Sequence, residues 1–108
     1  MSANDEAPLT GAQCRAARAL TDISRTMLAD ASKVAEEIIA GFERRLLEPE
    51  ADLRAALRHA LENFGALFLT DDGQGGAGVR LKFSAAEAER IENLENEGGQ
   101  VAEDDVVP

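Results

Sequence analysis

Residues 24–49, with the sequence SRTMLADASKVAEEIIAGFERRLLEP, decide the fold of this chain. Their apolar side chains form two short groups, each with helical spacing. The two groups are Leu28, Ala29 and Ala31, followed by Val34, Ile38, Ile39 and Phe42. The Ala-Ser-Lys-Val segment that separates them is too short for a loop and does not suit a straight helix. The pattern predicts two helices joined at a steep angle by a turn of about three or four residues.

Capping signals place the helices around this unit. Thr10 and Gln13 have the spacing of a capping box, which predicts a helix over residues 11–21. We expect Cys14, Ala17 and Leu20 to form its buried stripe.

Ser24 is suited to cap the first helix of the central unit, which we expect to end at Asp30 or Ala31. Met27 and Leu28 are its predicted buried residues. The second helix of the unit is predicted over residues 35–45.

A fourth helix is predicted to begin near residues 50–52, just after Pro49, and to end at Gly65. Its apolar stripe is the cleanest in the chain. The stripe consists of Leu53, Ala56, Leu57, Ala60, Leu61 and Phe64.

Residues 66–83 change to a strand pattern. An apolar run, ALFLT, precedes the glycine-rich segment DDGQGGAG and the alternating segment VRLKF, which predicts a β-hairpin. A two-stranded hairpin is marginal alone in water, so we expect it to pack on the helices or to pair with another copy as a homodimer contact. We further expect a disordered arm at residues 1–8, a helix-turn-helix domain at 9–65, a short amphipathic helix at 84–97 and a disordered acidic tail at 98–108.

The formal net charge of −10 is unevenly distributed. Residues 11–82 hold ten Arg and Lys against eleven Asp and Glu, whereas residues 83–108 hold one Arg against eight acids. The acidity therefore lies mostly in the tail. The predicted domain is nearly neutral and shows no strongly basic stripe, so any electrostatic contribution to nucleic-acid binding is expected to be modest.

Several classes of site have little support. Cys14 is the only cysteine, which excludes an internal disulfide, and we expect it to be a small buried side chain. His59 has no ligand-spaced partners, and GQGGAG lies within a hairpin, so we predict no metal, no cofactor and no enzyme activity. No apolar run is long enough to span a bilayer and no signal peptide is visible, which favours a cytoplasmic protein.

Residues 9–82 resemble the Xre or phage-repressor family of helix-turn-helix regulators. The similarity lies in LTGAQCRAARAL, LADASKV, IIAGFERRLLEP and LRAALRHALENFGALFL, with GVRLK after the glycine-rich turn. It is closest to short proteobacterial members that end in such a hairpin. The resemblance implies a mainly α, lambda repressor-like bundle of four to five helices, followed by a short β-hairpin and a C-terminal helix.

The resemblance also implies a DNA-binding surface. The family places the second helix of the unit in the major groove and rests the start of the first on a phosphate. Carried over by position, the groove-facing residues are Ala35, Glu36, Glu37, Ala40, Gly41 and Arg44. Arg25 and Arg45 are further phosphate contacts, with Arg15 and Arg18 as secondary candidates.

This chain departs from the family at several of these positions. Relatives usually have Gln at the position of Arg25 and Gly at the position of Lys33, where we expect a left-handed turn without glycine. Glu36 and Glu37 replace polar or basic residues. In the first turn of a helix, acids also have a purely structural explanation, because the helix dipole stabilises them. Gly41 in mid-helix suggests either close approach of another backbone or decay of an unused surface.

Two functions are compatible with these features. The first is a sequence-specific regulator that binds double-stranded DNA as a dimer and acts by occupying an operator. The second is a degenerate helix-turn-helix protein that uses the same face to bind another regulatory protein. Both require the same core, so the framework residues do not separate them.

Overall fold

Four helices precede a two-stranded antiparallel hairpin in residues 8–84, the part of the chain that the computed structural model describes. The elements are α2 Gly11–Thr21, α3 Arg25–Ser32, α4 Glu36–Glu43, α5 Ala51–Asn63, β1 Ala66–Leu69 and β2 Gly78–Leu81. The structure thus confirms a mainly helical domain with a hairpin. The predicted C-terminal helix at 84–97 and tail at 98–108, like almost all of the predicted arm, lie outside the described residues.

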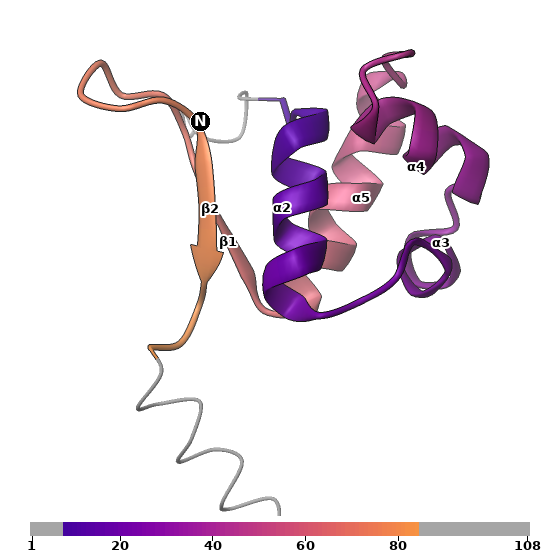
Figure 1. The fold of residues 1–108 in the computed structure, drawn as a ribbon, viewed down its shortest axis with the longest axis horizontal. Helices are drawn as coiled ribbons and strands as arrows, with labels where there is room; N and C mark the ends of the chain where they lie inside the picture. The colour runs from indigo at the N-terminus through magenta and orange to yellow at the C-terminus, as the bar shows by residue number, and fades with distance from the viewer. Residues whose placement is uncertain (1–7, 85–108) are drawn as a thin grey trace, which may run out of the picture.

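Helices α2 and α5 form the middle of the domain. The hairpin packs against α2 and α5 on one side, while α3 and α4 pack on the other side (Figure 1). The core between them is built from apolar residues of every helix and of β1. Its buried members are Leu9, Cys14, Ala17, Ile23, Leu28, Val34, Ile39, Phe42, Leu57, Ala60, Leu61, Ala66 and Phe68.

The predicted capping box at the start of α2 is present and also anchors the hairpin. The Gln13 backbone N–H donates to Thr10 Oγ1 at 3.0 Å, and the Thr10 N–H donates to Gln13 Oε1 at 3.1 Å. Gln13 Nε2 donates to the carbonyl oxygens of Leu69, at 3.3 Å, and Gly78, at 2.9 Å. One amide side chain therefore caps α2 and joins it to both strands.

Three helices end at non-glycine residues in the left-handed conformation. Asp22, Lys33 and Arg45 have φ of 61°, 67° and 62°. At the end of α4, the Arg45 N–H donates to the Phe42 carbonyl and the Leu46 N–H to the Gly41 carbonyl. This pair of bonds is a Schellman motif, which explains why α4 ends at Glu43 and not at residue 45 as predicted.

Three residues predicted to be buried are exposed, namely Leu20, Met27 and Phe64. Leu20 lies in the last turn of α2, where the chain turns away and Ile23 takes the inward position. In α3 only Leu28 is buried, so Met27 faces solvent. Phe64 follows the last turn of α5 and lines a shallow hollow with Leu81 and residues beside it.

Within residues 8–84, none of the helices has the length and apolar character needed to cross a membrane.

Lys33→Gly is expected to raise the free energy of unfolding by about 0.5–1 kcal/mol, because glycine adopts a positive φ without the strain that a Cβ causes. Urea denaturation followed by circular dichroism measures the change. Lys33→Ala is the matched control, since it removes the same charge and keeps the Cβ. Equal stability of the two variants would contradict this explanation.

Candidate functional site

Helix α4 has an inner and an outer face. Ile39, Phe42 and Glu43 are buried against the rest of the domain. The outer face, defined here as Glu36, Glu37, Ala40 and Arg44, is exposed except for Ala40, which is half-buried. The helical period of 3.6 residues produces this division, because the buried positions recur at a spacing of three to four.

The turn before α4 fixes how this helix leaves α3. Lys33 closes α3 by donating its N–H to the Ala29 carbonyl at 2.8 Å. The next residue, Val34, is buried, and its N–H donates to Ser32 Oγ at 3.2 Å. Ala35 is extended and exposed, and its carbonyl accepts the first hydrogen bonds of α4. The turn is therefore closed by local bonds and held by one apolar side chain.

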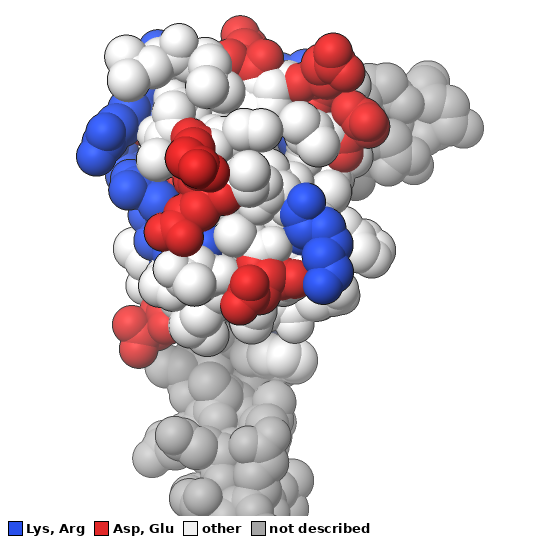
Figure 2. Space-filling model, turned by 90° about the vertical axis from the view of Figure 1, so that its right-hand side faces the viewer, with Lys and Arg blue, Asp and Glu red and all other residues white. Residues whose placement is uncertain are grey.

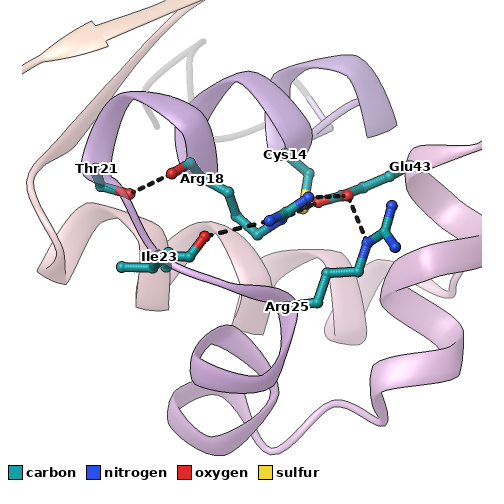
Figure 3. Close-up of polar contacts among 6 residues, drawn as sticks. All are labelled: Cys14, Arg18, Thr21, Ile23, Arg25 and Glu43. Carbon is teal, nitrogen blue, oxygen red and sulfur yellow. Dashed lines mark hydrogen bonds and ion pairs between the residues drawn. The ribbon is translucent and has the colours of Figure 1, made fainter.

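The buried carboxylate of Glu43 joins three helices (Figure 3). Oε1 accepts from Arg18 Nη2 at 2.7 Å and from Arg25 Nε at 3.0 Å. Oε2 accepts from Arg18 Nε at 2.8 Å and from Cys14 Sγ at 3.2 Å. The bidentate pair with Arg18 is the geometry in which arginine binds carboxylates most strongly. These bonds attach α4 to α2 and to the start of α3.

The neighbours of Glu43 keep it ionised in spite of its burial. Burial alone raises the pKa of this carboxyl, but hydrogen bonds from Arg18, Cys14 and Arg25 outweigh burial and hold the pKa below its ordinary value. Hydrogen bonding to Glu43 raises the pKa of Arg18. Burial, followed by the hydrogen bond to Glu43, raises the pKa of the Cys14 thiol, so Cys14 is a protonated donor.

This network changes the expected roles of two arginines. Arg18 donates three of its hydrogen bonds inside the domain, two to Glu43 and one to the Ile23 carbonyl at 3.3 Å. It therefore has a structural role, and its predicted secondary role as a phosphate contact stays a prediction. Arg25 uses only Nε for Glu43, and no bond within residues 8–84 involves its terminal nitrogens. Arg15 is exposed on α2.

The start of α3 and the outer face of α4 come together as the sequence predicts. Arg25, Glu36, Glu37 and Ala40 line one open hollow of about 380 Å³. Glu36 Oε1 accepts from the hydroxyl of Thr26 at 3.2 Å, which links the first turns of α3 and α4. The hollow is therefore polar at its rim, with one cation, two carboxylates and a methyl group.

The end of α4 holds the remaining predicted site residues. Arg44 and Arg45 are exposed. A Cβ on Gly41 would lie 2.6 Å from Leu47 Cδ2, so this glycine makes room for the returning chain after α4. The predicted close approach of another backbone is wrong among the described residues, since the close neighbour is a side chain, whereas decay of an unused surface stays a prediction. The contact leaves Gly41 partly covered.

Figure 2 shows the face that carries α3 and α4, with basic side chains along the left edge of the view and a further basic group right of the middle. Acidic side chains lie between and around these groups, so charges of both signs are interspersed on this face. This distribution agrees with the near neutrality of residues 11–82.

His59 and Cys14 do not lie in a cluster of possible metal ligands in the described part of the chain. Among residues 8–84, no group of three or more His, Cys, Asp or Glu side chains lies together as metal ligands would. His59 is exposed on α5, and the thiol of Cys14 is engaged with Glu43.

Sequence analysis missed the role of Glu43. Its partners Arg18 and Arg25 lie 25 and 18 positions away in the chain, beyond the reach of local sequence patterns. A signal for burial was available, because Glu43 extends the inner stripe of Ile39 and Phe42.

A search against protein-family models finds no match to this chain, and a search of curated proteins finds none either.

Glu43→Gln is expected to lower the free energy of unfolding by about 2–4 kcal/mol, since it leaves two arginines facing an uncharged group in a mostly buried place. Urea denaturation at neutral pH measures the loss. Glu62→Gln is the matched control. Its partner Arg58 lies one turn away in α5 and both side chains are partly exposed, so a loss under about 0.5 kcal/mol is expected. Similar losses in the two variants would contradict a special role for Glu43.

The contribution of Glu43 is also expected to depend on pH. Because its pKa is lower in the folded than in the unfolded chain, the stabilisation is present above the unfolded pKa and is lost as the pH falls through the folded pKa. The stability difference between wild type and Glu43→Gln is therefore expected to be constant from neutral pH to about pH 5 and then to shrink. Denaturation series at several pH values test this. A difference that grows on acidification contradicts it.

Proposed function

We propose that the protein binds double-stranded DNA through α3 and α4, as a helix-turn-helix unit of the lambda repressor-like, Xre type. In this proposal it is a cytoplasmic transcriptional regulator that acts as a dimer by occupying an operator. The observation that supports the proposal most is the division of α4. Its inner face is fixed to α2 and α3 through Glu43, while its outer face is uncovered within residues 8–84.

The arrangement of α3 and α4 suits insertion into a major groove. A short closed turn separates them, and the second helix of such a unit meets base edges with its first residues. On this chain those residues are Glu36, Glu37 and Ala40, and Ala35 stands just before them. Arg44 follows one turn later on the same face.

The cations are placed at the margins of this surface. Arg25 has its Nε fixed by Glu43, and this contact leaves its terminal nitrogens for a phosphate. Arg44 and Arg45 are the corresponding phosphate contacts at the end of α4. Gly41 makes room for Leu47 in the chain that returns after α4, and in this proposal it makes no polar contact with the duplex.

The two carboxylates have different assignments in this proposal. Glu36 accepts from Thr26, so its position is set by the protein itself. Glu37 has no such bond among the described residues, and a carboxylate can accept from the amino group of cytosine. Glu37 is thus the residue that would select a base. Its negative charge is repelled by nearby phosphates, which lowers the affinity for DNA.

A second function is favoured by the charge of this surface. The acidic side chains that lie beside the basic ones on the face in Figure 2 suit a basic protein partner. In that alternative, the outer face of α4 binds another regulatory protein, which the chain antagonises or assists.

The two functions are separated by measuring binding to a random duplex short enough for one protomer, by fluorescence anisotropy at increasing salt. DNA binding predicts that affinity falls steeply with salt, with a log–log slope of several. Arg44→Ala is expected to weaken binding and to reduce the slope by about 1. Arg80→Ala, which removes an exposed arginine on the hairpin, is the matched control and is expected to change neither.

Glu37→Gln gives an independent result in the same assay. Removal of one negative charge near phosphates is expected to tighten binding to random duplex several-fold. Selection from a random DNA pool then tests whether Glu37 reads a base, since the variant should lose a preference at one position. Absence of binding to any duplex at low salt would rule out the DNA-binding function and favour the protein partner.

A further inference from the structure

The inner face of the hairpin extends past the end of α5. Ala66 is fully buried against the helices, and its partner across the sheet is Leu81. Paired residues share one face of an antiparallel sheet, so Leu81 also belongs to the inner face. Helix α5 ends at Asn63, however, and Leu81 is 41% exposed. The end of β2 therefore presents apolar surface that the helices of residues 8–84 cover only in part.

A hollow of about 280 Å³ lies where the end of β2 meets the end of α5. The Lys82 N–H donates to the Gly65 carbonyl at 2.8 Å and joins the two sides of this hollow. Phe64 and Phe83 are 38% and 48% exposed, so two aromatic rings and a leucine face whatever binds there. The end hollow, as we call it, is lined by Asn63, Phe64, Gly65, Leu81, Lys82 and Phe83.

This apolar surface is too small for a stable contact between two copies. A large apolar side chain has about 150–250 Å² of surface, so the exposed parts of Phe64, Leu81 and Phe83 together offer roughly 250 Å². A stable interface between proteins buries at least about 600 Å² on each partner. A segment of the same chain needs less, because a short linker holds it at a millimolar effective concentration. The end hollow therefore suits its own chain better than a second copy.

The segment that follows the end hollow in the chain has a matching apolar stripe. Residues 85–97, AAEAERIENLENE, lie outside the described residues and begin two positions after Phe83. Ala88, Ile91 and Leu94 recur every third residue, which predicts an amphipathic helix with these three on one face. At 1.5 Å per residue, Ile91 is about 9 Å from the start of such a helix. Ile91 therefore reaches the hollow when the helix folds back from Phe83.

Charge also favours this segment. Residues 85–97 contain five Glu and one Arg. Lys82 is exposed beside the hollow, and no carboxylate of residues 8–84 forms an ion pair with it. Glu87 and Glu95 stand one turn before and one turn after Ile91 on the same side of the predicted helix. A helix that places Ile91 in the end hollow therefore brings a carboxylate toward Lys82.

We propose that residues 85–97 fold back as a helix and bind the end hollow, with Ile91 in contact with Phe64 and Phe83. The inference goes beyond the proposed function and does not depend on it, since the end hollow shares no residue with the outer face of α4. The hairpin and α4 lie on opposite sides of α2 and α5 (Figure 1), so this contact leaves the outer face of α4 uncovered.

A single tryptophan in the full chain tests the contact, since the sequence contains neither Trp nor Tyr. In Ile91→Trp the indole replaces the side chain that enters the hollow. In Asn93→Trp, the matched control, it points to the opposite side of the helix, because each residue turns the helix by about 100°. The emission of Ile91→Trp is expected to be blue-shifted, and its quenching by acrylamide to be weaker, relative to Asn93→Trp.

Substitutions of the domain are then combined with Ile91→Trp. Phe83→Ser is expected to lower the equilibrium constant for binding of the segment about tenfold, because it removes apolar surface from the contact. Quenching then rises toward that of Asn93→Trp. Leu69→Ser is the control, since Leu69 is 41% exposed on the outer face of β1 and lies outside the hollow. Lys82→Glu repels the acidic segment and is expected to lower the constant about three- to fivefold.

A second measurement uses no added indole. Ile91→Ser in the ¹⁵N-labelled full chain is expected to change the amide chemical shifts of Phe64, Gly65 and Lys82, and to leave those of Arg25 and Ala40 unchanged. Circular dichroism confirms that each variant is folded.

Equal quenching of Ile91→Trp and Asn93→Trp overturns the proposal, as does a quenching of Ile91→Trp that Phe83→Ser does not alter. A difference between the two tryptophan variants that appears only as the protein concentration rises also overturns it, because a second copy then fills the hollow.

Discussion

A single buried carboxylate connects α4 to α2 and to the start of α3. Glu43 belongs to α4, and it receives hydrogen bonds from Cys14 and Arg18 of α2 and from Arg25 at the start of α3. A buried charge without partners would be very costly, so the three elements must stay in register for the carboxylate to remain bound. The same bonds define the direction of α4, since Glu43 stands at its last turn and Val34 is buried just before its first.

The two arginines that bind Glu43 differ in how much of their guanidinium group the domain uses. Arg18 donates three hydrogen bonds inside the domain, whereas Arg25 is held by Nε alone and lines the hollow beside Glu37 and Ala40. A site built on a fixed helix needs little reorganisation when a ligand binds. The hairpin is attached separately through Gln13, on the other side of α2 and α5. Helix α4 and the hairpin thus lie on opposite sides of one core (Figure 1).

Most of the local structure could be predicted from the sequence, because short-range signals determine it. The capping box at Thr10, the cap at Ser24 and the left-handed conformation of Lys33 depend on neighbouring residues, and all are present. The role of Glu43 could not be predicted in this way, because its partners lie on two other helices. The closeness of Leu47 to Gly41 likewise depends on how the chain returns after α4. Long-range packing decides these features.

We propose that Glu43 holds α4 rigidly and that the outer face of α4 is free to meet a duplex. Amide chemical-shift changes in the ¹⁵N-labelled full chain, titrated with a short duplex at low salt, test this most directly. The account predicts the largest changes at Arg25, Glu37, Ala40 and Arg44, with Leu67 and Leu69 unaffected. Changes confined to the hairpin, or spread evenly over the domain, would contradict it.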